Sequence, residues 1–232
     1  MKNIAVILAG GVGSRMGGQL PKQFLEIKGR PMICYAIDAF NCHAMIDELA
    51  VVVHPQWCNY MEEIAASCRW DKLKKIIKGG DERYLSSYNA VKAYSDQPDD
   101  TNLLLHDAAR PWVSECIITR VVEALRKHEA VGVAVPSTDT VWEVCPGFGR
   151  QQDYYVARIP ERKFMWRAQT PQGFRLPLIA EAYRIALSDP AFTATDDCGV
   201  VHRYMPEVNI HVVKGERENI KVTHPEDMAE IN

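Results

Sequence analysis

The sequence has no apolar run long enough to cross a membrane and no excess of positive charge. None of its apolar stretches approaches the ~20 residues that span a bilayer. A strand is predicted almost at once, after Lys2, without the pattern of a secretory signal peptide. The net charge of −3 gives no reason to expect nucleic-acid binding, because domains with that function usually carry a basic excess. We therefore expect a cytoplasmic protein that binds neither a membrane nor a nucleic acid.

Cysteine follows no pattern typical of a metal centre or a disulfide framework. The seven cysteines are scattered, their number is odd, and none forms a C-x-x-C pair. We therefore expect reduced thiols rather than disulfides or a structural metal. With 232 residues, of which 47% are hydrophobic, the chain is long enough to form one large α/β domain, residues 1–232, without such cross-links.

The glycine-rich loop after the first predicted strand lacks the two commonest nucleotide-binding signatures. Residues 4–9 (IAVILA) are an apolar run that predicts a buried strand of a parallel sheet. A dinucleotide fingerprint based on Gly11 and Gly13 would need glycine where Met16 stands, and no Gly-Lys-Ser/Thr follows as in a P-loop. The loop therefore belongs to neither class.

What this loop has instead is exposed backbone and positive charge. Glycines at 10, 11 and 13 let the chain turn sharply and expose its N–H groups, and Arg15 and Lys22 add two cations. The oxygens of a polyphosphate accept hydrogen bonds from backbone amides, and their charge is neutralised by such cations. Glycines alone are equally typical of an ordinary surface turn. The two cations and the preceding strand favour a polyphosphate site.

Apolar runs and helical periodicities alternate along most of the chain. Further strands are predicted at 49–54, 73–78, 102–107, 131–136 and 208–215, and helices at 31–41, 56–67, 114–128 and 177–187. Another helix is expected after TATDD at 193–197, which offers an N-cap. Because strand, helix, strand is the unit of a parallel sheet, this order predicts an α/β fold with a mostly parallel sheet flanked by helices.

The alternation is interrupted at about 139–159. Two β-prone runs, DTVWEV and YYVARI, flank a turn-rich centre, which predicts an inserted hairpin that exposes Trp142, Tyr154 and Tyr155. Such a β-arm can cover an active site or pair with a second subunit. Residues 160–174 carry several cations with little periodicity, and this pattern predicts a binding loop.

Polar residues follow two other predicted strands. Asp107 ends the strand at 102–107, and ligands of open α/β sheets bind beyond the carboxyl ends of strands, next to the glycine loop. A carboxylate there suits a polyphosphate when Mg²⁺ lies between them. The alternative, which is compatible, is an Asp107–Arg110 pair that closes a turn. GGDERYLSS at 79–87 either supplies ligand contacts from a helix N-terminus or contains ordinary first-turn residues.

Seven ordered motifs can be compared together with known enzymes. They are LAGG-x-GSRMG with PKQF, GGDER-x-x-S, HDAARP, DT at 139–140, R-x₇-TPQ-x-F, TDD and NIKVT. In order and spacing they resemble the 2-C-methyl-D-erythritol 4-phosphate cytidylyltransferases of the non-mevalonate isoprenoid route. The resemblance implies a Rossmann-like nucleotidyltransferase fold, a homodimer joined by its β-arms, and CTP and Mg²⁺ as co-substrate and cofactor. It also implies that a polyol phosphate attacks the α-phosphorus of CTP and releases pyrophosphate.

The same resemblance implies roles for individual residues. For the nucleotide and the metal these are Ala9, Gly10, Gly11, Gly13, Arg15, Lys22, Gly80, Asp81, Ser86, Asp107, Ala108 and Lys221. Among them, Arg15, Lys22 and Lys221 would be catalytic cations near the phosphates, and Asp107 would hold Mg²⁺. For the acceptor the resemblance implies Arg110, Arg162 and Thr170, the last two contributed by the partner's arm, along with Thr195 and Asp196.

Other activities are compatible with parts of the sequence. Gly10, the GSRMG that follows it and Trp57 look equally like the related ribitol-5-phosphate cytidylyltransferases, which make CDP-ribitol, whereas HDAARP and TDD look more like the methylerythritol enzymes. A nucleotide-sugar synthase that uses UTP or GTP would share the first loop. A non-catalytic nucleotide-binding protein would not need Asp107 together with Arg15, Lys22 and Lys221, so this set favours an enzyme.

Overall fold

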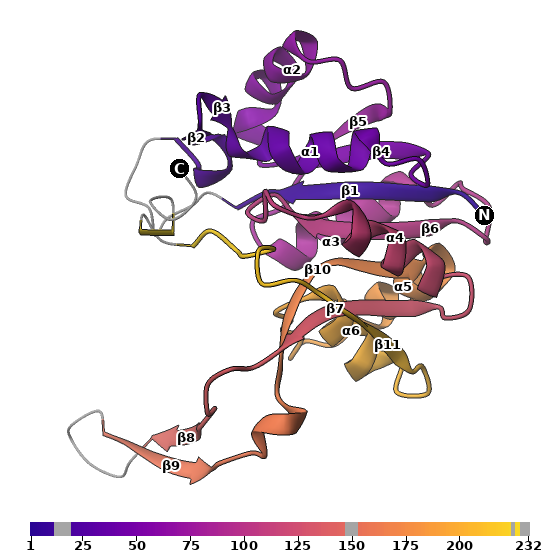
Figure 1. Cartoon of the computed structure of the whole chain (residues 1–232). Coiled ribbons are helices and arrows are strands. Elements are labelled where there is room, and N and C mark those ends of the chain that lie inside the picture. Colours follow the sequence, from indigo (N-terminus) through magenta and orange to yellow (C-terminus); the bar gives the residue numbers. More distant parts are fainter. Residues whose placement is uncertain (12–19, 147–152, 224–225, 228–232) are drawn as a thin grey trace.

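The computed structural model of the chain describes residues 1–11, 20–146, 153–223 and 226–227 (Figure 1). Its strands are β1 (Asn3–Ala9), β2 (Glu26–Ile27), β3 (Arg30–Pro31), β4 (Glu48–Val53), β5 (Leu73–Lys78), β6 (Asn102–Asp107), β7 (Ala130–Pro136), β8 (Glu143–Pro146), β9 (Tyr154–Arg158), β10 (Trp166–Arg175) and β11 (Ile210–Lys214). Its helices are α1 (Met32–Cys42), α2 (Cys58–Ser67), α3 (Arg83–Ala93), α4 (Glu115–Ala124), α5 (Leu176–Ala186) and α6 (Asp197–Tyr204). Short 3-10 helices lie at Lys22–Phe24, Pro55–Trp57 and Arg162–Phe164.

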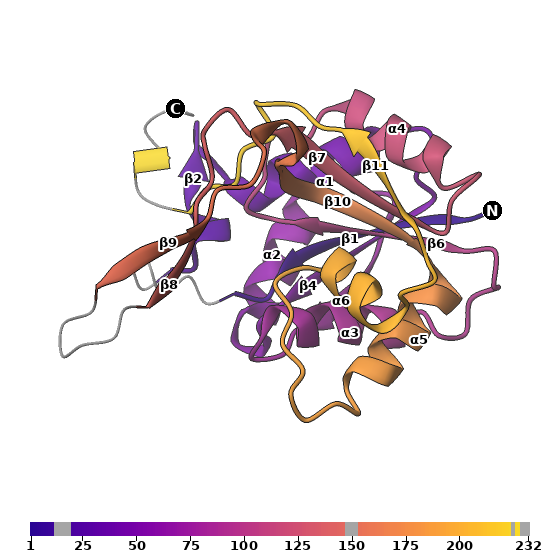
Figure 2. The same ribbon diagram turned by 90° about the horizontal axis from the view of Figure 1, so that it is seen from below.

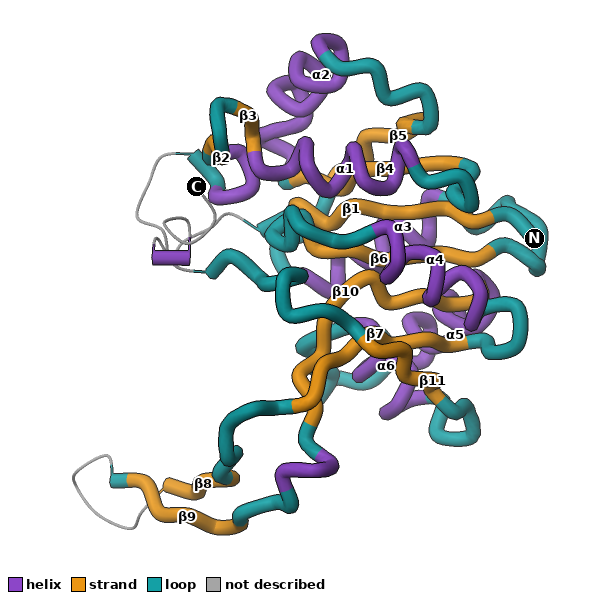
Figure 3. Tube along the Cα trace, viewed as in Figure 1, coloured by secondary structure: helices purple, strands orange, loops and turns teal. Residues whose placement is uncertain are grey.

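A central sheet of seven strands organises the molecule, in the order β11-β7-β10-β6-β1-β4-β5 (Figure 3). Every neighbouring pair is parallel except for β10, which runs antiparallel to both β6 and β7. The inner parallel strands β1, β4 and β6, and also β7, are nearly continuous apolar runs because helices cover both of their faces. The mostly parallel α/β fold predicted from the sequence is therefore confirmed.

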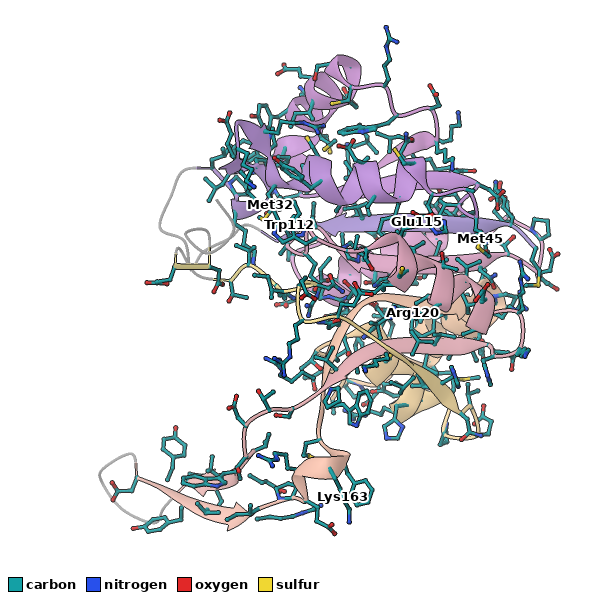
Figure 4. The ribbon with its side chains drawn as sticks, viewed as in Figure 1. Met32, Met45, Trp112, Glu115, Arg120 and Lys163 are labelled. Atoms are coloured by element: carbon teal, nitrogen blue, oxygen red, sulfur yellow. The ribbon has the colours of Figure 1, made fainter. Side chains whose placement is uncertain are left out.

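The two faces of the sheet bury separate apolar clusters. One cluster joins alternate residues of β1 and β4 to α1, α2 and α4, and the other joins the remaining residues of those strands to α3, α5 and α6. A smaller cluster at one end packs Met32 and Val222 with Ile27, and Trp112 lies against it (Figure 4). This small cluster holds the C-terminal segment near the carboxyl end of β1.

Side-chain caps fix the starts of two helices. Ser114 accepts a hydrogen bond from the backbone N–H of Ile117 at 3.2 Å, which begins α4, and Asp196 caps α6 through the N–H of Gly199 at 2.8 Å. The predicted N-cap in TATDD is therefore present. The helix predicted at 114–128 ends earlier, at Ala124, because the backbone continues into turns.

The prediction of a binding loop at 160–174 is wrong for most of that segment. Residues from Trp166 onward form β10, which lies in the middle of the sheet. Its central residues are buried although they are polar. The side chains of Gln169, Thr170 and Gln172 form hydrogen bonds to a loop, to β6 and to the first residue of α6, respectively. A central strand built this way has no apolar alternation that the sequence could reveal.

The inserted hairpin projects away from the sheet (Figures 1 and 2). Its strands β8 and β9 pair antiparallel, and both are exposed along their whole length. Lys163 lies just beyond β9, at the base of the arm in Figure 4. Among the described residues, no helix combines the length and apolarity needed to span a bilayer.

Candidate active site

The carboxyl ends of β1 and β6 meet at one cavity of about 200 Å³. Leu8 lies opposite Asp107 in the sheet, and the N–H of Ala108 donates to the carbonyl oxygen of Leu8 at 3.0 Å. The described residues that line this first cavity are Leu8, Ala9, Gly10, Gly11, Lys22, Gln23, Asp81, Glu82, Arg83, Ser86, Asp107, Ala108, Ala109 and Lys221. The predicted crevice between the glycine loop and Asp107 is therefore present.

Gln23 holds the start of the glycine loop. Its side-chain amide is buried and donates to the carbonyl oxygens of Ala9 and Gly11 at 2.8 and 3.0 Å. The neighbouring Lys22 donates through Nζ to the carbonyl oxygen of Val222 at 2.8 Å. Gln23 is part of the PKQF motif, but the sequence alone gave it no role. The contacts assign it to the support of the loop backbone.

Two glycines, Gly10 and Gly79, let the chain pass close to Ser86. A Cβ atom at Gly10 would lie 2.3 Å from the Oγ of Ser86, and one at Gly79 would lie 2.8 Å from the same atom. The hydroxyl of Ser86 also accepts from the N–H of Gly80 at 3.2 Å. Side chains at Gly10 or Gly79 would force this hydroxyl to move, so the two loops pack through backbone alone. Gly80 itself is not among the residues that line the cavity.

The carboxylate of Asp107 is held by two cations. Its Oδ1 accepts from the Nε of Arg83 at 3.2 Å, and its Oδ2 accepts from the Nζ of Lys221 at 2.7 Å. Burial opposes the charged form, but Arg83 and then Lys221 outweigh it and keep the pKa of Asp107 well below its usual range. Asp107 is therefore ionised at neutral pH and lies directly beside the cation of the NIKVT motif.

Arg110 closes the turn after β6 in a different way from the predicted ion pair. Its backbone N–H donates to the carbonyl oxygen of Asp107 at 3.0 Å, while its guanidinium donates to the carbonyl oxygens of Asn219 and Ala168 at 2.7 and 3.1 Å. The predicted Asp107–Arg110 salt bridge is thus absent from the described ion pairs, in which Asp107 pairs with Arg83 and Lys221.

His106 lies fully buried below this turn, and its hydrogen bonds define its tautomer. Nε2 lies 3.0 Å from the carbonyl oxygen of Arg110, which can only accept, so Nε2 carries the proton. Nδ1 then accepts from the hydroxyl of Thr170 at 3.0 Å, and the same hydroxyl accepts from the N–H of Asp107 at 3.1 Å. Burial lowers the pKa of His106 to about 4. A neutral imidazole with both nitrogens engaged positions the backbone of Asp107 and has no free nitrogen for base catalysis.

A second cavity of about 230 Å³ adjoins the first. It is lined by Arg83, Asp107, Arg110, Ala168, Gln169, Thr170, Gln172, Thr195, Asp196 and Lys221. Four residues expected to bind the acceptor, Arg110, Thr170, Thr195 and Asp196, are brought together here. Arg83, Asp107 and Lys221 line both cavities and form the wall that they share.

The profile of the 2-C-methyl-D-erythritol 4-phosphate cytidylyltransferase family matches residues 3–232. The chain belongs to this cytidylyltransferase family. The protein of that name from Thermobifida fusca is 48% identical over 97% of this chain and 90% of its own length. A bifunctional ribulose 5-phosphate reductase/CDP-ribitol pyrophosphorylase from Haemophilus influenzae is 37% identical over 98% of this chain, which spans 47% of that longer protein.

Solved structures of cytidylyltransferases share the fold. The 4-diphosphocytidyl-2C-methyl-D-erythritol synthase of Anaerococcus prevotii superposes with a TM-score of 0.85 at 30% identity, over 100% of this chain and 94% of that chain. The 2-C-methyl-D-erythritol 4-phosphate cytidylyltransferase of Francisella tularensis superposes with a TM-score of 0.80 at 26% identity, over 99% of this chain and 98% of that chain. The nucleotidyltransferase-type fold expected from the sequence motifs is therefore confirmed.

Not every site residue expected of a cytidylyltransferase lies at the two cavities. Gly13 and Arg15 lie outside the described residues. Arg162 lies at the base of the arm, where its guanidinium donates to the carbonyl oxygen of Thr138 at 3.3 Å, and it lines neither cavity. Thr170 was expected from the partner's arm together with Arg162, and this is wrong: Thr170 lies in β10 and lines the second cavity of its own chain.

Proposed function

We propose that this chain transfers the cytidylyl group of CTP to 2-C-methyl-D-erythritol 4-phosphate and releases pyrophosphate. The observation that carries the proposal is the wall of Arg83, Asp107 and Lys221 shared by the two cavities. In this assignment the nucleotide occupies the first cavity and the acceptor occupies the second. The α-phosphorus of CTP and the acceptor phosphate would then meet at the ammonium group of Lys221.

The reaction requires charge neutralisation and alignment more than proton transfer. An oxygen of the acceptor phosphate attacks the α-phosphorus, and the bond from that phosphorus to the β-phosphate bridging oxygen breaks. Both reacting groups are already anionic, so cations that face them lower the barrier. Lys22 and Lys221 come from opposite ends of the sequence to the same cavity, which supports this role. The roles of Arg15 and Gly13 remain part of the proposal, with Arg15 as a further cation at the triphosphate.

The donor set of the site fits Mg²⁺ bound together with a triphosphate. Among the described residues no group of three or more histidine, cysteine or acidic side chains could hold a metal ion alone. Asp107 offers one ionised carboxylate, and Mg²⁺ is commonly held by one or two carboxylates plus substrate phosphates and water. Asp107 would hold the ion, whose charge would stabilise the phosphates during transfer. Lys221 would then be released in part to the anionic substrates.

We also propose a homodimer that forms through the β-arm. The arm and its base expose large apolar side chains that a monomer would leave in water: Val141, Trp142, Val144, Tyr154, Tyr155, Val156, Ile159, Phe164 and Trp166. Arg162 at the base of the arm would reach the second cavity of the partner and bind the acceptor phosphate. Light scattering over a range of concentrations should find a dimer, and a single monomeric species would contradict this proposal.

The position of two residues bears on the choice of acceptor. Gly10 and Trp57 are two of the three features that favoured ribitol 5-phosphate, and the third, GSRMG, lies outside the described residues. Gly10 contacts Ser86 on the nucleotide side, and Trp57 packs with Phe24 and Tyr60, at ring-centroid distances of 5.7 and 6.0 Å. Neither residue lines the second cavity. Thr195 and Asp196 of the TDD motif, which favoured the methylerythritol enzymes, do line it, and this supports methylerythritol phosphate over ribitol phosphate.

The experiment that tests the reaction class is pyrophosphate release with methylerythritol phosphate, Mg²⁺ and each of CTP, UTP, GTP and ATP. We expect release with CTP that exceeds release with the others by at least about tenfold. An Asp107→Asn variant provides the matched inactive control. Preference for UTP or GTP would favour a nucleotide-sugar synthase, and CTP binding without release would favour a non-catalytic protein. The cytoplasmic location and the single catalytic domain expected from the sequence remain predictions.

A further inference from the structure

Arg83 is the residue of the shared wall to which no role has been given so far. It is the first residue of α3, in the GGDER segment, and its side chain is 26% exposed. Its guanidinium donates through Nε to Asp107 at 3.2 Å and through a terminal nitrogen to the Oδ2 of Asp197 at 2.9 Å. One side chain therefore joins β6, α3 and α6.

The second partner of Arg83 is a fully buried carboxylate. Asp197 is 0% exposed, and its Oδ1 accepts from the hydroxyl of Tyr183 at 2.7 Å. A buried carboxylate is tolerated only when it is paired and hydrogen-bonded. Burial opposes the charge of Arg83, but Asp197 and Asp107 outweigh it and raise the pKa of the guanidinium. The Arg83–Asp197 ion pair is thus a buried structural contact and not a solvent-exposed surface pair.

Asp197 begins the helix whose preceding residues line the second cavity. Gln172 accepts from the N–H of Asp197 at 3.0 Å and donates to the Oδ2 of Asp196 at 2.8 Å. Thr195 and Asp196 are held by this segment, and both line the second cavity. Asp107 lines both cavities. A displacement of Arg83 would therefore move residues that line the first cavity and residues that line the second.

We propose that Arg83 is a positioning residue that couples the nucleotide cavity to the acceptor cavity, by holding Asp107 and the start of α6 in one frame. The inference rests on the proposed assignment of the two cavities to CTP and the acceptor. When CTP fills the first cavity and takes up the cations around Asp107, Arg83 transmits the change to Asp197 and hence to Thr195 and Asp196. Occupation of one cavity then favours occupation of the other.

The test measures binding without turnover. Calorimetry gives the dissociation constant of methylerythritol phosphate, in Mg²⁺, with and without α,β-methylene-CTP, which cannot release pyrophosphate. In the wild-type protein we expect the analogue to tighten acceptor binding by about tenfold, a typical size for coupled sites. In Arg83→Gln we expect this ratio to fall to about one, while the analogue alone binds within about threefold of wild type. Arg83→Lys, which can pair with one carboxylate only, should lie between them.

Two variants separate coupling from loss of charge or of packing. Arg203→Gln removes a guanidinium from the same helix α6, where Arg203 pairs with Asp189 away from both cavities. Tyr183→Phe removes the other hydrogen bond to Asp197 but leaves Arg83 in place. Both should keep the tenfold ratio, and thermal unfolding confirms that each variant is folded.

Several outcomes would overturn the inference. They are an unchanged ratio in Arg83→Gln, an equal loss of coupling in Tyr183→Phe, and a wild-type ratio of one. These results would leave the proposed function intact as long as the wild-type protein binds the CTP analogue and the acceptor. Failure of the wild-type protein to bind the CTP analogue at all would instead overturn the proposed function, and this inference with it.

Discussion

The contact between Gly10 and Ser86 gives a prediction that can be worked through from the structure. In Gly10→Ala the new Cβ would lie 2.3 Å from the Oγ of Ser86 and 3.2 Å from its Cβ. Since 2.3 Å is far below any normal contact, the hydroxyl must rotate away, whereas the Cβ contact requires a shift of only a few tenths of an ångström. The substitution therefore acts mainly by displacing the hydroxyl of Ser86.

The size of the effect follows from what that hydroxyl does. In its present position it accepts from the N–H of Gly80 at 3.2 Å and lines the nucleotide cavity. In the proposed function this hydroxyl also forms a hydrogen bond to bound CTP, and loss of one such hydrogen bond costs about 1 kcal/mol of binding free energy. This amounts to about a fivefold loss of CTP affinity, because about 1.4 kcal/mol corresponds to tenfold. Ser86→Ala removes the same hydrogen bond, so we expect a loss of similar size.

The assay is a double-mutant cycle on the dissociation constant of CTP, measured by calorimetry without acceptor. Because both changes remove the same hydroxyl interaction, the double variant Gly10→Ala/Ser86→Ala should bind CTP about as well as Ser86→Ala alone. Gly11→Ala is the matched control, since no described atom lies within 4 Å of its added Cβ. Its effect should add to that of Ser86→Ala. Additive losses for Gly10→Ala and Ser86→Ala, or no loss for Gly10→Ala, would refute the reasoning.

Three further predictions concern charge and protonation. Lys221→Met should lower kcat/KM by about 10²–10³ in steady-state kinetics, which is typical for loss of one electrostatic contact to a transition state; a loss below about fivefold would contradict its role. Because burial lowers the pKa of His106 from 6.5 to about 4, the folded chain binds fewer protons than the unfolded chain between these values. The stability contributed by neutral His106 is present above pH 6.5 and is lost as pH falls towards 4, by about 3 kcal/mol; urea titrations of His106→Gln should show a correspondingly smaller loss, and an equal loss would contradict it. Removal of divalent cations with EDTA should abolish pyrophosphate release, and added Mg²⁺ should restore it; full activity in EDTA would exclude Asp107 as a metal-binding residue.

The sequence predicted best those elements whose apolar residues are also the residues that the fold buries. β1 and β6 are short and largely apolar, and β5 has apolar residues at both faces between its lysines. A glycine follows β1 and β5, and β6 ends on Asp107, so the ends of these strands are visible in the sequence. The helix of residues 114–128 was predicted too long because its apolar spacing continues to Leu125, although the backbone turns after Ala124. Periodicity reports which face is buried and not where the hydrogen bonds of a helix end.

β10 could not be predicted because its buried positions are polar. Gln169, Thr170 and Gln172 are 5%, 4% and 2% exposed. The side chains of Gln169 and Gln172 bind loops of the site, and that of Thr170 binds the end of β6. Pro171, within a shift in register between Gln169 and Gly173, also argued against a central strand. The polar residues of β10 position the site, and the same residues hide the apolar alternation by which a strand is recognised in a sequence.

The candidate site was predicted where residues touch the proposed ligand and missed where they touch one another. Asp107, Lys22 and Lys221 were expected from charge and motif, and the structure brings them to one cavity. No individual role was expected for Gln23 or Arg83. Gln23 binds a backbone carbonyl oxygen, and Arg83 binds a carboxylate more than 100 positions away. Contacts of that kind depend on the tertiary fold, and a single sequence does not contain them.

The most direct test of the central claim is a comparison of two acceptors. Pyrophosphate release from CTP and Mg²⁺ would be measured side by side with 2-C-methyl-D-erythritol 4-phosphate and D-ribitol 5-phosphate. We predict a kcat/KM that is more than tenfold higher with methylerythritol phosphate, which corresponds to more than about 1.4 kcal/mol of differential transition-state binding. An equal or higher kcat/KM with ribitol 5-phosphate would contradict the proposed function.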